Sequence, residues 1–243
     1  MTSPLTTGLV NGRFVRRSDV DSAVRDAMFE ILQTHFSGVG REPFDADLNE
    51  KNWVILLEDD GGALRGFSTV LVYEDRSLGR PVTVVYSGDT IVARDWWGSP
   101  ALPATWLRAV RHIVPVQERE AYWLLITSGF RTYRFLPVFF RRFHPAVTGG
   151  EADAHILQTL AHAKFGNRYD ASRGIVTLRH PQVLVPELLE VPERRTADPH
   201  VAFFMQRNPG YIRGDELVCI TRIAEDNLTA AGRRIWTSRS GQP

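Results

Sequence analysis

Residues 90–110 read TIVARDWWGSPALPATWLRAV, and this stretch joins a strand to a helix through a glycine-containing turn. Ser99 is a residue type that accepts hydrogen bonds at helix N-termini, and Pro100 suits the first helical position. The apolar residues behind the turn recur at the spacing of one helix face: Leu102, Trp106, Ala109, Val110 and Ile113. The sequence therefore predicts a strand over 82–92, a turn after it, and an amphipathic helix behind the turn.

The residues before this stretch predict helical structure followed by an antiparallel meander. Asp21 and its neighbours give a helix N-cap signal, and apolar residues at helical spacing follow over 20–36. The run KNWVILLEDDGGALRGFSTVLVYED, residues 51–75, holds two apolar strands separated by the turn signal Asp-Asp-Gly-Gly. A short strand over 11–17 and a short helix over 46–51 complete this part of the prediction.

The residues after it predict a strand, a helix and a longer C-terminal part. Residues 122–127 are continuously apolar, which is typical of a central strand, and 131–143 is predicted as a helix that Pro137 kinks. Further on we expect helices over 152–165 and 227–236 and strands over 174–178 and 215–223. We therefore expect an α/β fold of one domain, with a core over 1–150 and a C-terminal extension over 151–243 packed on it.

Composition excludes several classes of protein. The 243 residues are 43% hydrophobic and 23% charged, with a formal net charge of +1, so nothing in the overall charge favours nucleic acid as a partner. The single cysteine, Cys219, excludes an internal disulfide, and the seven histidines show no metal-ligand spacing. No apolar run reaches the length of a membrane span, and no secretory leader is evident. We therefore expect a cytoplasmic protein without a metal or prosthetic group.

The order of elements resembles the GNAT superfamily of N-acetyltransferases over roughly residues 11–145. Residues 51–75 look like that family's second and third strands. Residues 90–110 stand where the family has its fourth strand, its pyrophosphate loop and the helix behind that loop. The resemblance implies a mixed central sheet flanked by helices, and an acyl donor that is a pantetheine thioester.

The family's loop implies a set of donor-binding residues in this chain. The loop usually reads Arg or Gln, two residues, Gly, one residue, then Gly or Ala, whereas here three residues separate Arg94 from Gly98. The carry-over assigns donor binding to Arg94, Trp97, Gly98, Ser99 and Arg131. A helix N-terminus attracts anions, and glycine permits close approach of the backbone. The alternative is that Gly98-Ser99-Pro100 is an ordinary strand-to-helix turn and that Trp97 only packs.

Three residues are candidates for catalysis. In the family a residue after the fifth strand and a tyrosine on the next helix flank the donor thiol, which here implies Ser128 and, as general acid, Tyr133. Asp89 is the only acid inside its predicted strand, on one face with Ser87 and Ile91, and a buried carboxylate has the raised pKa that a general base needs. The alternatives are that Tyr133 belongs to the core and that Asp89 sits at a bulge beside Gly88; Glu74 is the reserve base.

The predicted helix at 131–143 and the C-terminal part bear on the length of the donor's acyl chain and on how its phosphates are bound. The phenylalanines of these segments are candidates to line a tunnel for a long acyl chain, as in the N-acyl amino acid synthase-like branch of the superfamily, or simply to form a core: Phe135, Phe139, Phe140, Phe143, Phe203 and Phe204. The arginines of the same helix are candidates for binding phosphates or for covering aromatic surface: Arg131, Arg134, Arg141 and Arg142.

Two classes of function follow. The first is an N-acyltransferase that moves an acyl group from acyl-CoA or an acyl-carrier protein to an amine of a small molecule, amino acid or peptide. The second is a non-catalytic module of the same fold that binds a thioester, a peptide or a protein partner.

Overall fold

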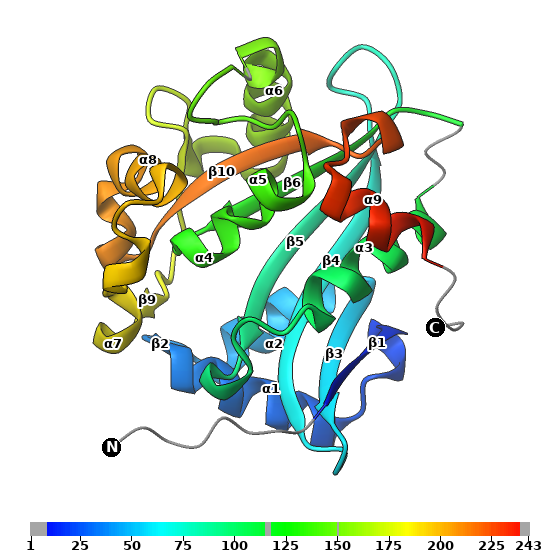
Figure 1. Cartoon of the computed structure of the whole chain (residues 1–243), viewed down its shortest axis with the longest axis vertical. Helices are drawn as coiled ribbons and strands as arrows, with labels where there is room; N and C mark the ends of the chain where they lie inside the picture. The colour runs from blue at the N-terminus through cyan, green and yellow to red at the C-terminus, as the bar shows by residue number, and fades with distance from the viewer. Residues whose placement is uncertain (1–8, 115–117, 150, 239–243) are drawn as a thin grey trace.

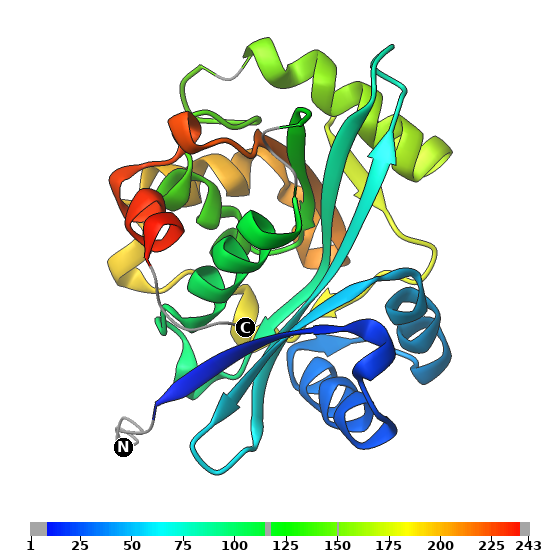
Figure 2. The same cartoon turned by 90° about the vertical axis from the view of Figure 1, so that its right-hand side faces the viewer.

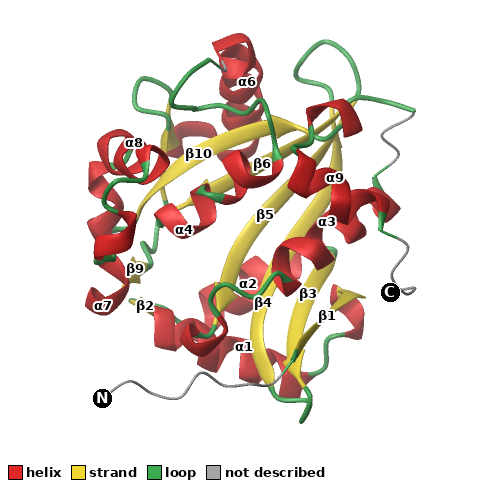
Figure 3. Cartoon of the chain, in the orientation of Figure 1, coloured by secondary structure: helices red, strands yellow, loops and turns green. Residues whose placement is uncertain are grey.

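The computed structural model describes residues 9–114, 118–149 and 151–238. Its centre is an eight-stranded sheet with the order β1–β3–β4–β5–β6–β10–β8–β7 (Figures 1 and 3). Of the neighbouring pairs described in this sheet, β5 and β6 alone run parallel. A separate two-stranded ladder joins β2 to β9. The strands are β1 Val10–Arg16, β2 Phe36–Ser37, β3 Trp53–Asp59, β4 Leu64–Asp75, β5 Val82–Val92, β6 Ala121–Thr127, β7 Tyr169–Asp170, β8 Ile175–Thr177, β9 Val183–Leu184 and β10 Asp215–Arg222.

Helices cover both faces of the sheet, as the view along its edge shows (Figure 2). One face packs against α3, α4, α5, α8 and α9, and the other against α1 and α2 at one end and α6 at the other. The helices are α1 Ser22–His35, α2 Arg41–Glu50, α3 Ala101–Ile113, α4 Phe130–Tyr133, α5 Phe135–Phe139, α6 Ala154–Phe165, α7 Pro186–Leu189, α8 Pro199–Arg207 and α9 Ala230–Thr237.

Strand alternation explains the two layers. In β3, Ile55 and Leu57 pack towards α3, whereas Val54 and Leu56 between them pack against α1 and α2. Successive side chains of a strand point to opposite faces, so a continuously apolar strand buries residues on both. The expected α/β class, a mixed sheet flanked by helices, is confirmed by this topology.

The C-terminal part of the chain supplies a strand to the middle of the sheet. β10 pairs with β6 on one side and with β8 on the other. Its residues Leu217 and Cys219 join the core on the α3 face, and Val218 and Ile220 join the core beneath α6. The core over 1–150 and the extension over 151–243 therefore share one sheet.

The helix expected over 131–143 is wrong in its extent. The chain forms two short helices, α4 and α5, which meet at Arg134, and α5 ends at Phe139. Proline has no N–H to donate, so Pro137 cannot bond the carbonyl of Tyr133 and a continuous helix is interrupted there. In the first turn of α5 the missing donor costs little, because helix N-termini leave those N–H groups without an intrahelical partner. The short helix expected over 46–51 also differs, since α2 begins at Arg41.

Candidate active site at the divergence of β5 and β6

A β-bulge near the C-terminal end of β5 sets the position of Asp89. Ser68 on β4 pairs with Thr90, and Val70 pairs with Ser87, so two residues of β5, Gly88 and Asp89, oppose a single residue of β4. A bulge inserts one extra residue and changes the direction of the strand. The expected common face of Ser87, Asp89 and Ile91 is therefore wrong for Ser87. Ser87 bonds two tryptophans on the α3 side, whereas Ile91 packs with α1 and α2.

A cleft opens where the two parallel strands part. Their pairing ends at Ser87 and Leu125, although both strands continue beyond it (Figure 1). The cleft has a volume of about 1160 Å³ and is lined from both layers of helices. Asp89, Ser128, Trp97, Gly98 and Ser99 all line it. The structure thus brings most of the predicted site residues to one place.

Two carboxyl groups with raised pKa values line the cleft. Burial, and next the charge of Asp47, raise the pKa of Asp89 to about 7, although Lys51 acts in the opposite direction. Burial, and next the charge of Asp89, raise the pKa of Glu216 on β10 to about 8, while a hydrogen bond from Ser128 lowers it. Carboxyl groups that titrate near neutrality are able both to accept and to return a proton.

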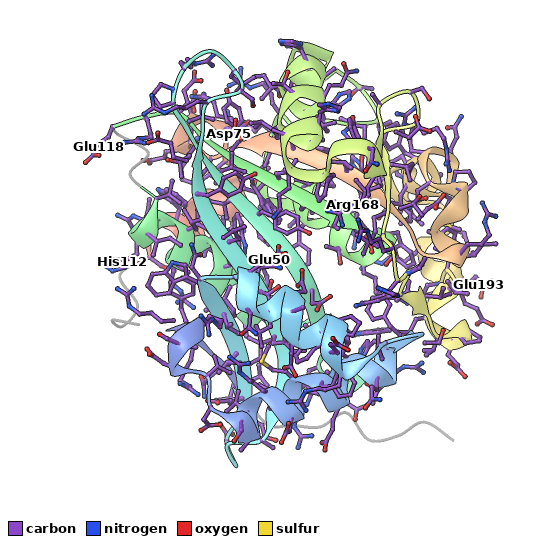
Figure 4. The ribbon with its side chains drawn as sticks, turned by 180° about the vertical axis from the view of Figure 1, so that it is seen from behind. Glu50, Asp75, His112, Glu118, Arg168 and Glu193 are labelled. Atoms are coloured by element: carbon purple, nitrogen blue, oxygen red, sulfur yellow. The ribbon has the colours of Figure 1, made fainter. Side chains whose placement is uncertain are left out.

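Two lysines lie beside the carboxyl groups at this end of the cleft, Lys51 as the C-cap residue of α2 and Lys164 on α6. The ammonium of Lys51 lies 2.6 Å from Asp47 Oδ1, and that of Lys164 lies 3.6 Å from Glu50 Oε2. Both ammonium groups stand over the ring of Tyr86, at 5.5 and 5.0 Å from its centroid. Figure 4 shows this side of the molecule, with Glu50 labelled on α2. Asp47 and Glu50 pair with the two lysines, whereas Asp89 and Glu216, with pKa values of about 7 and 8, become charged only as the pH rises through that range.

The opposite end of the cleft is aromatic and basic. The Arg131 guanidinium stacks on the ring of Trp97, 4.2 Å from its centroid, and on that of Phe130, at 4.6 Å. It also donates to the carbonyl of Leu188, and burial and then the charge of Arg94 lower its pKa. Arg94 lies 3.6 Å from Glu187 as an exposed ion pair, and the cleft lining does not include it. Arg131 therefore lies nearer to any bound ligand than Arg94 does.

The N-terminus of α3 offers fewer backbone donors than the sequence led us to expect. The N-cap residue is Pro100 instead of Ser99, whose hydroxyl accepts from Ala101 N at 3.2 Å. The Ala104 N–H bonds the carbonyl of Pro100, and neither Pro100 nor Pro103 has an N–H. Leu102 supplies the one first-turn amide left for a ligand. Gly98 has φ +98°, a conformation that favours glycine, so the turn itself requires this residue.

Tyr133 does not line the cleft, and its position argues against the expected role as general acid. Its side chain is fully buried, and its hydroxyl donates to the carbonyl of Pro145 at 2.9 Å. Its ring packs among Phe143, Phe203 and Phe204. Burial raises its pKa far above the ordinary value. The alternative interpretation of Tyr133 as a core residue is the one that the structure supports.

Some of the other predicted candidates line the cleft, and the rest lie elsewhere or are held in ion pairs. Glu74 is held by Arg76 and Arg119 and is absent from the cleft lining. Arg134 lines the cleft but pairs with Asp198 at 2.8 Å, and Arg142 pairs with Asp226 at 3.8 Å. Of the six phenylalanines proposed for a tunnel, Phe135 and Phe139 line the cleft and the other four do not.

The sequence reasoning missed Glu216 and Asp47. Glu216 carries a weaker signal than Asp89, because it stands beside a second acid, Asp215, at the start of the strand DELVCITR. Asp47 stands four residues before Lys51 on α2, a spacing that brings two helical side chains together. Neither signal says which cleft the residue faces, since that depends on strand and helix packing.

Comparison with known proteins gives similar solved structures. No family model and no curated protein matches the chain. A probable N-acyltransferase from Enterococcus faecalis is 11% identical over 56% of this chain, with a TM-score of 0.41, and the match spans 33% of that protein's length. A GNAT family N-acetyltransferase from Escherichia coli, solved with CoA, is 13% identical over 56% of this chain and 71% of its own, with a TM-score of 0.38.

An N-acyl amino acid synthase, FeeM from uncultured soil microbes, is 16% identical over 55% of this chain and 79% of its own, with a TM-score of 0.39. N-acetyltransferases of the superfamily that the sequence resembles are thus among the structures similar to this one. Because these TM-scores are low, the fold is assigned from its strand order, and the site is assigned from its own geometry.

Two other features were absent from the described residues, a membrane-spanning helix and a metal site. Within 9–114, 118–149 and 151–238, no helix has the length and apolar character needed to cross a membrane. Across the same ranges, no cluster of three or more His, Cys, Asp or Glu side chains has an arrangement able to hold a metal ion.

Proposed function

We propose that this chain is an N-acyltransferase of the GNAT type, which moves an acyl group from a pantetheine thioester to an amine by direct attack. The observation that carries the proposal is the pair Asp89 and Glu216, two carboxyl groups with pKa values of about 7 and 8 in the cleft between β5 and β6. An amine reaches the site mainly as an ammonium ion and must lose a proton before it attacks. The pair provides a base for that proton.

The carboxyl pair serves the first step of the proposed reaction. The ionised carboxylate of the pair takes one proton from the acceptor's ammonium, and the free amine then bonds to the thioester carbonyl carbon. Collapse of the tetrahedral intermediate breaks the carbon–sulfur bond, and the thiolate leaves with the proton that the attacking nitrogen loses. Ser128 orients Glu216 through its hydrogen bond. Positioning of the two substrates lowers the barrier further.

The chemistry of the cleft supports an orientation for the two substrates. The carboxyl groups of Asp89 and Glu216 suit an acceptor that brings a proton to the site, which is a small-molecule amine, an amino acid or a peptide. The basic and aromatic end around Arg131 suits the phosphate of the donor. Because the first turn of α3 has few free amides, we infer that guanidinium groups hold the donor more than backbone N–H groups do. Both acyl-CoA and an acyl-carrier protein fit this requirement.

A non-catalytic module that binds a thioester is the second candidate. It is favoured by the burial of Tyr133, which leaves the departing thiolate without the predicted general acid. The two candidates differ in one measurable respect, since the module would bind thioesters without releasing thiol in the presence of any amine.

The test is a thiol-release assay with acetyl-CoA and a panel of amines that includes polyamines, amino acids and lysine peptides. We expect release that depends on the amine, with a rate that rises with pH through about 7, because the base must lose its proton first. Asp89→Asn should slow turnover about 10²- to 10⁴-fold and remove this pH dependence. Unchanged turnover in Asp89→Asn would contradict the assignment of the base, and thioester binding without release for any amine would favour the module.

A further inference from the structure

A small side cavity adjoins the cleft on the α3 side of the sheet. It has a volume of about 30 Å³. Leu102, Pro103, Phe135 and Phe139 line both the cleft and this cavity, so the two spaces share walls. The deeper lining comes from α3, from β6 and from the segment after α5, with Trp106, Leu107, Trp123, Leu125 and Phe140. The cavity therefore offers a mostly apolar space that adjoins the cleft of the proposed reaction.

Ser87 contributes a buried hydroxyl group to the wall of this cavity, and the O–H of that group has no acceptor among the described residues. The indole N–H groups of Trp106 and Trp123 both donate to its Oγ, at 3.3 and 3.0 Å. A serine oxygen has two acceptor sites and one O–H donor, so both acceptor sites are taken. Within the described part of the chain, no side chain or carbonyl accepts from this O–H. Ser87 is 4% exposed, so bulk water does not replace the missing acceptor.

Three other residues of the cavity wall carry hydroxyl groups: Thr132 is half-buried and also lines the open cleft, whereas Ser68 and Thr90 differ from Ser87 in their hydrogen bonds. Ser68 and Thr90 bond each other at 2.8 Å, and Thr90 Oγ1 lies 3.4 Å from the carbonyl of Gly88. Their protons therefore have acceptors within the protein. An unsatisfied buried donor is costly, and a ligand atom that accepts from it recovers that cost on binding. Ser87 thus favours an acceptor atom inside a cavity whose wall is mostly apolar.

We propose that this cavity receives the acyl group of the donor, and that it selects a short chain carrying an oxo or hydroxy oxygen that accepts a hydrogen bond from Ser87. The proposal rests on the proposed function, since it concerns the donor of that reaction. One water-sized atom needs about 10–15 Å³ of such volume, so about 30 Å³ holds two or three non-hydrogen atoms. With the carbonyl and its neighbouring carbon at the mouth, the chain has about four carbons.

This specificity departs from the long-chain donor that the phenylalanines suggested. Phe143, Phe203 and Phe204 pack around Tyr133, and Phe140 closes the cavity against Trp123, with ring centroids 5.8 Å apart. The rings of Trp106 and Trp123 lie 4.1 Å apart and close the same wall. A chain of eight carbons would have to displace these buried rings.

The test measures the binding of four pantetheine thioesters to the whole protein by calorimetry, namely butyryl, octanoyl, acetoacetyl and isovaleryl. Acetoacetyl and isovaleryl have the same number and connectivity of non-hydrogen atoms and differ in one of them, an oxo oxygen in place of a methyl carbon. Pantetheine is the part that CoA and a carrier protein share, so the result does not depend on which is the natural donor. We expect butyryl to bind at least tenfold more tightly than octanoyl, and acetoacetyl about five- to tenfold more tightly than isovaleryl.

Ser87→Ala should abolish the preference for acetoacetyl over isovaleryl, while Ser68→Ala, which removes a satisfied hydroxyl from the same wall, should keep it. If Ser87→Ala does not fold, the four thioesters on the unaltered protein still decide the matter. Equal affinity for acetoacetyl and isovaleryl, or octanoyl binding as tightly as butyryl, would overturn the cavity's role and leave the acyltransferase standing. If none of the four thioesters bound, the proposed function would fail together with the cavity.

Discussion

Asp89 and Glu216 are carboxyl groups whose environment works against their ionised forms. Burial raises the pKa of both groups; the charge of Asp47 adds to the shift of Asp89, and the charge of Asp89 adds to that of Glu216. Their protons are therefore titrated as a pair, with apparent values near 7 and 8. A base that titrates at neutral pH suits proton transfer, and the same feature predicts a cost to the stability of the folded chain.

That cost should appear as a dependence of stability on pH. The folded protein keeps the proton of Asp89 up to about pH 7, whereas the unfolded chain releases it near pH 4. Between these values the folded state binds more protons, so the free energy of unfolding falls as the pH rises. We expect Asp89→Asn to be more stable than the unaltered protein by about 1–3 kcal/mol at pH 8.5, and nearly equal to it at pH 4.

Urea unfolding at the two pH values measures this effect. Asp95→Asn is the matched control, because Asp95 is an exposed acid and its replacement should change stability by less than about 0.5 kcal/mol at either pH. A loss of stability in Asp89→Asn at pH 8.5 would show that the carboxylate is favourably held in the folded state.

Tyr133 is predicted to matter for stability and little for turnover. Tyr133→Phe removes the hydrogen bond to the carbonyl of Pro145, which should lower the free energy of unfolding by about 1 kcal/mol. Tyr73→Phe is the control, since the Tyr73 hydroxyl is buried with no hydrogen-bond partner among the described residues and its loss should be neutral or stabilising. A turnover rate that fell a hundredfold in Tyr133→Phe would restore Tyr133 as a catalytic acid.

At the scale of the element, the bulge in β5 connects backbone geometry with the site. A Cβ at Gly88 would lie 2.7 Å from Thr69 Oγ1 and 2.9 Å from Lys51 Cε. Gly88→Ala should therefore cost about 1–3 kcal/mol, because a side chain or the strand itself must move. Asp89 is the next residue, so we also expect turnover to fall by more than the lost stability explains.

Gly129→Ala provides the comparison for that variant. Its Cβ would meet only Leu184 Cδ1, at 3.7 Å, and Gly129 has an extended backbone with φ −136°. Melting temperature and turnover measured side by side separate the two effects. If Gly88→Ala matched Gly129→Ala in both, the bulge would not be what places Asp89.

At the scale of the whole molecule, β10 joins the two parts of the chain. Without it, β6 would have a bare edge, and both cores would lose the apolar side chains of this strand. We expect a fragment of residues 1–150 not to fold by itself. Circular dichroism during heating should show no cooperative transition for the fragment and one for the whole chain. A cooperative transition in the fragment would establish residues 1–150 as an independent domain.

The sequence predicted the elements that depend on local patterns. The strand over 82–92 has the predicted bounds, and the helix behind Gly98 lies where its apolar spacing puts it. It also identified Asp89, Ser128, Trp97, Gly98, Ser99 and Arg131 as a group, and all of them line one cleft. Periodicity, turn residues and an acid inside an apolar strand are read from neighbours along the chain, so one sequence is sufficient to find them.

Tertiary structure alone decided how these residues are used. The pairing of Glu216 with Asp89, the bulge that separates Ser87 from Ile91, the burial of Tyr133 and the cavity beside Ser87 all join segments that are distant in sequence. A carboxyl pKa depends on the desolvation and charges that packing creates, and whether a hydroxyl proton has an acceptor depends on the groups that packing places around it. These properties belong to the packed chain, because they arise from contacts that no local pattern encodes.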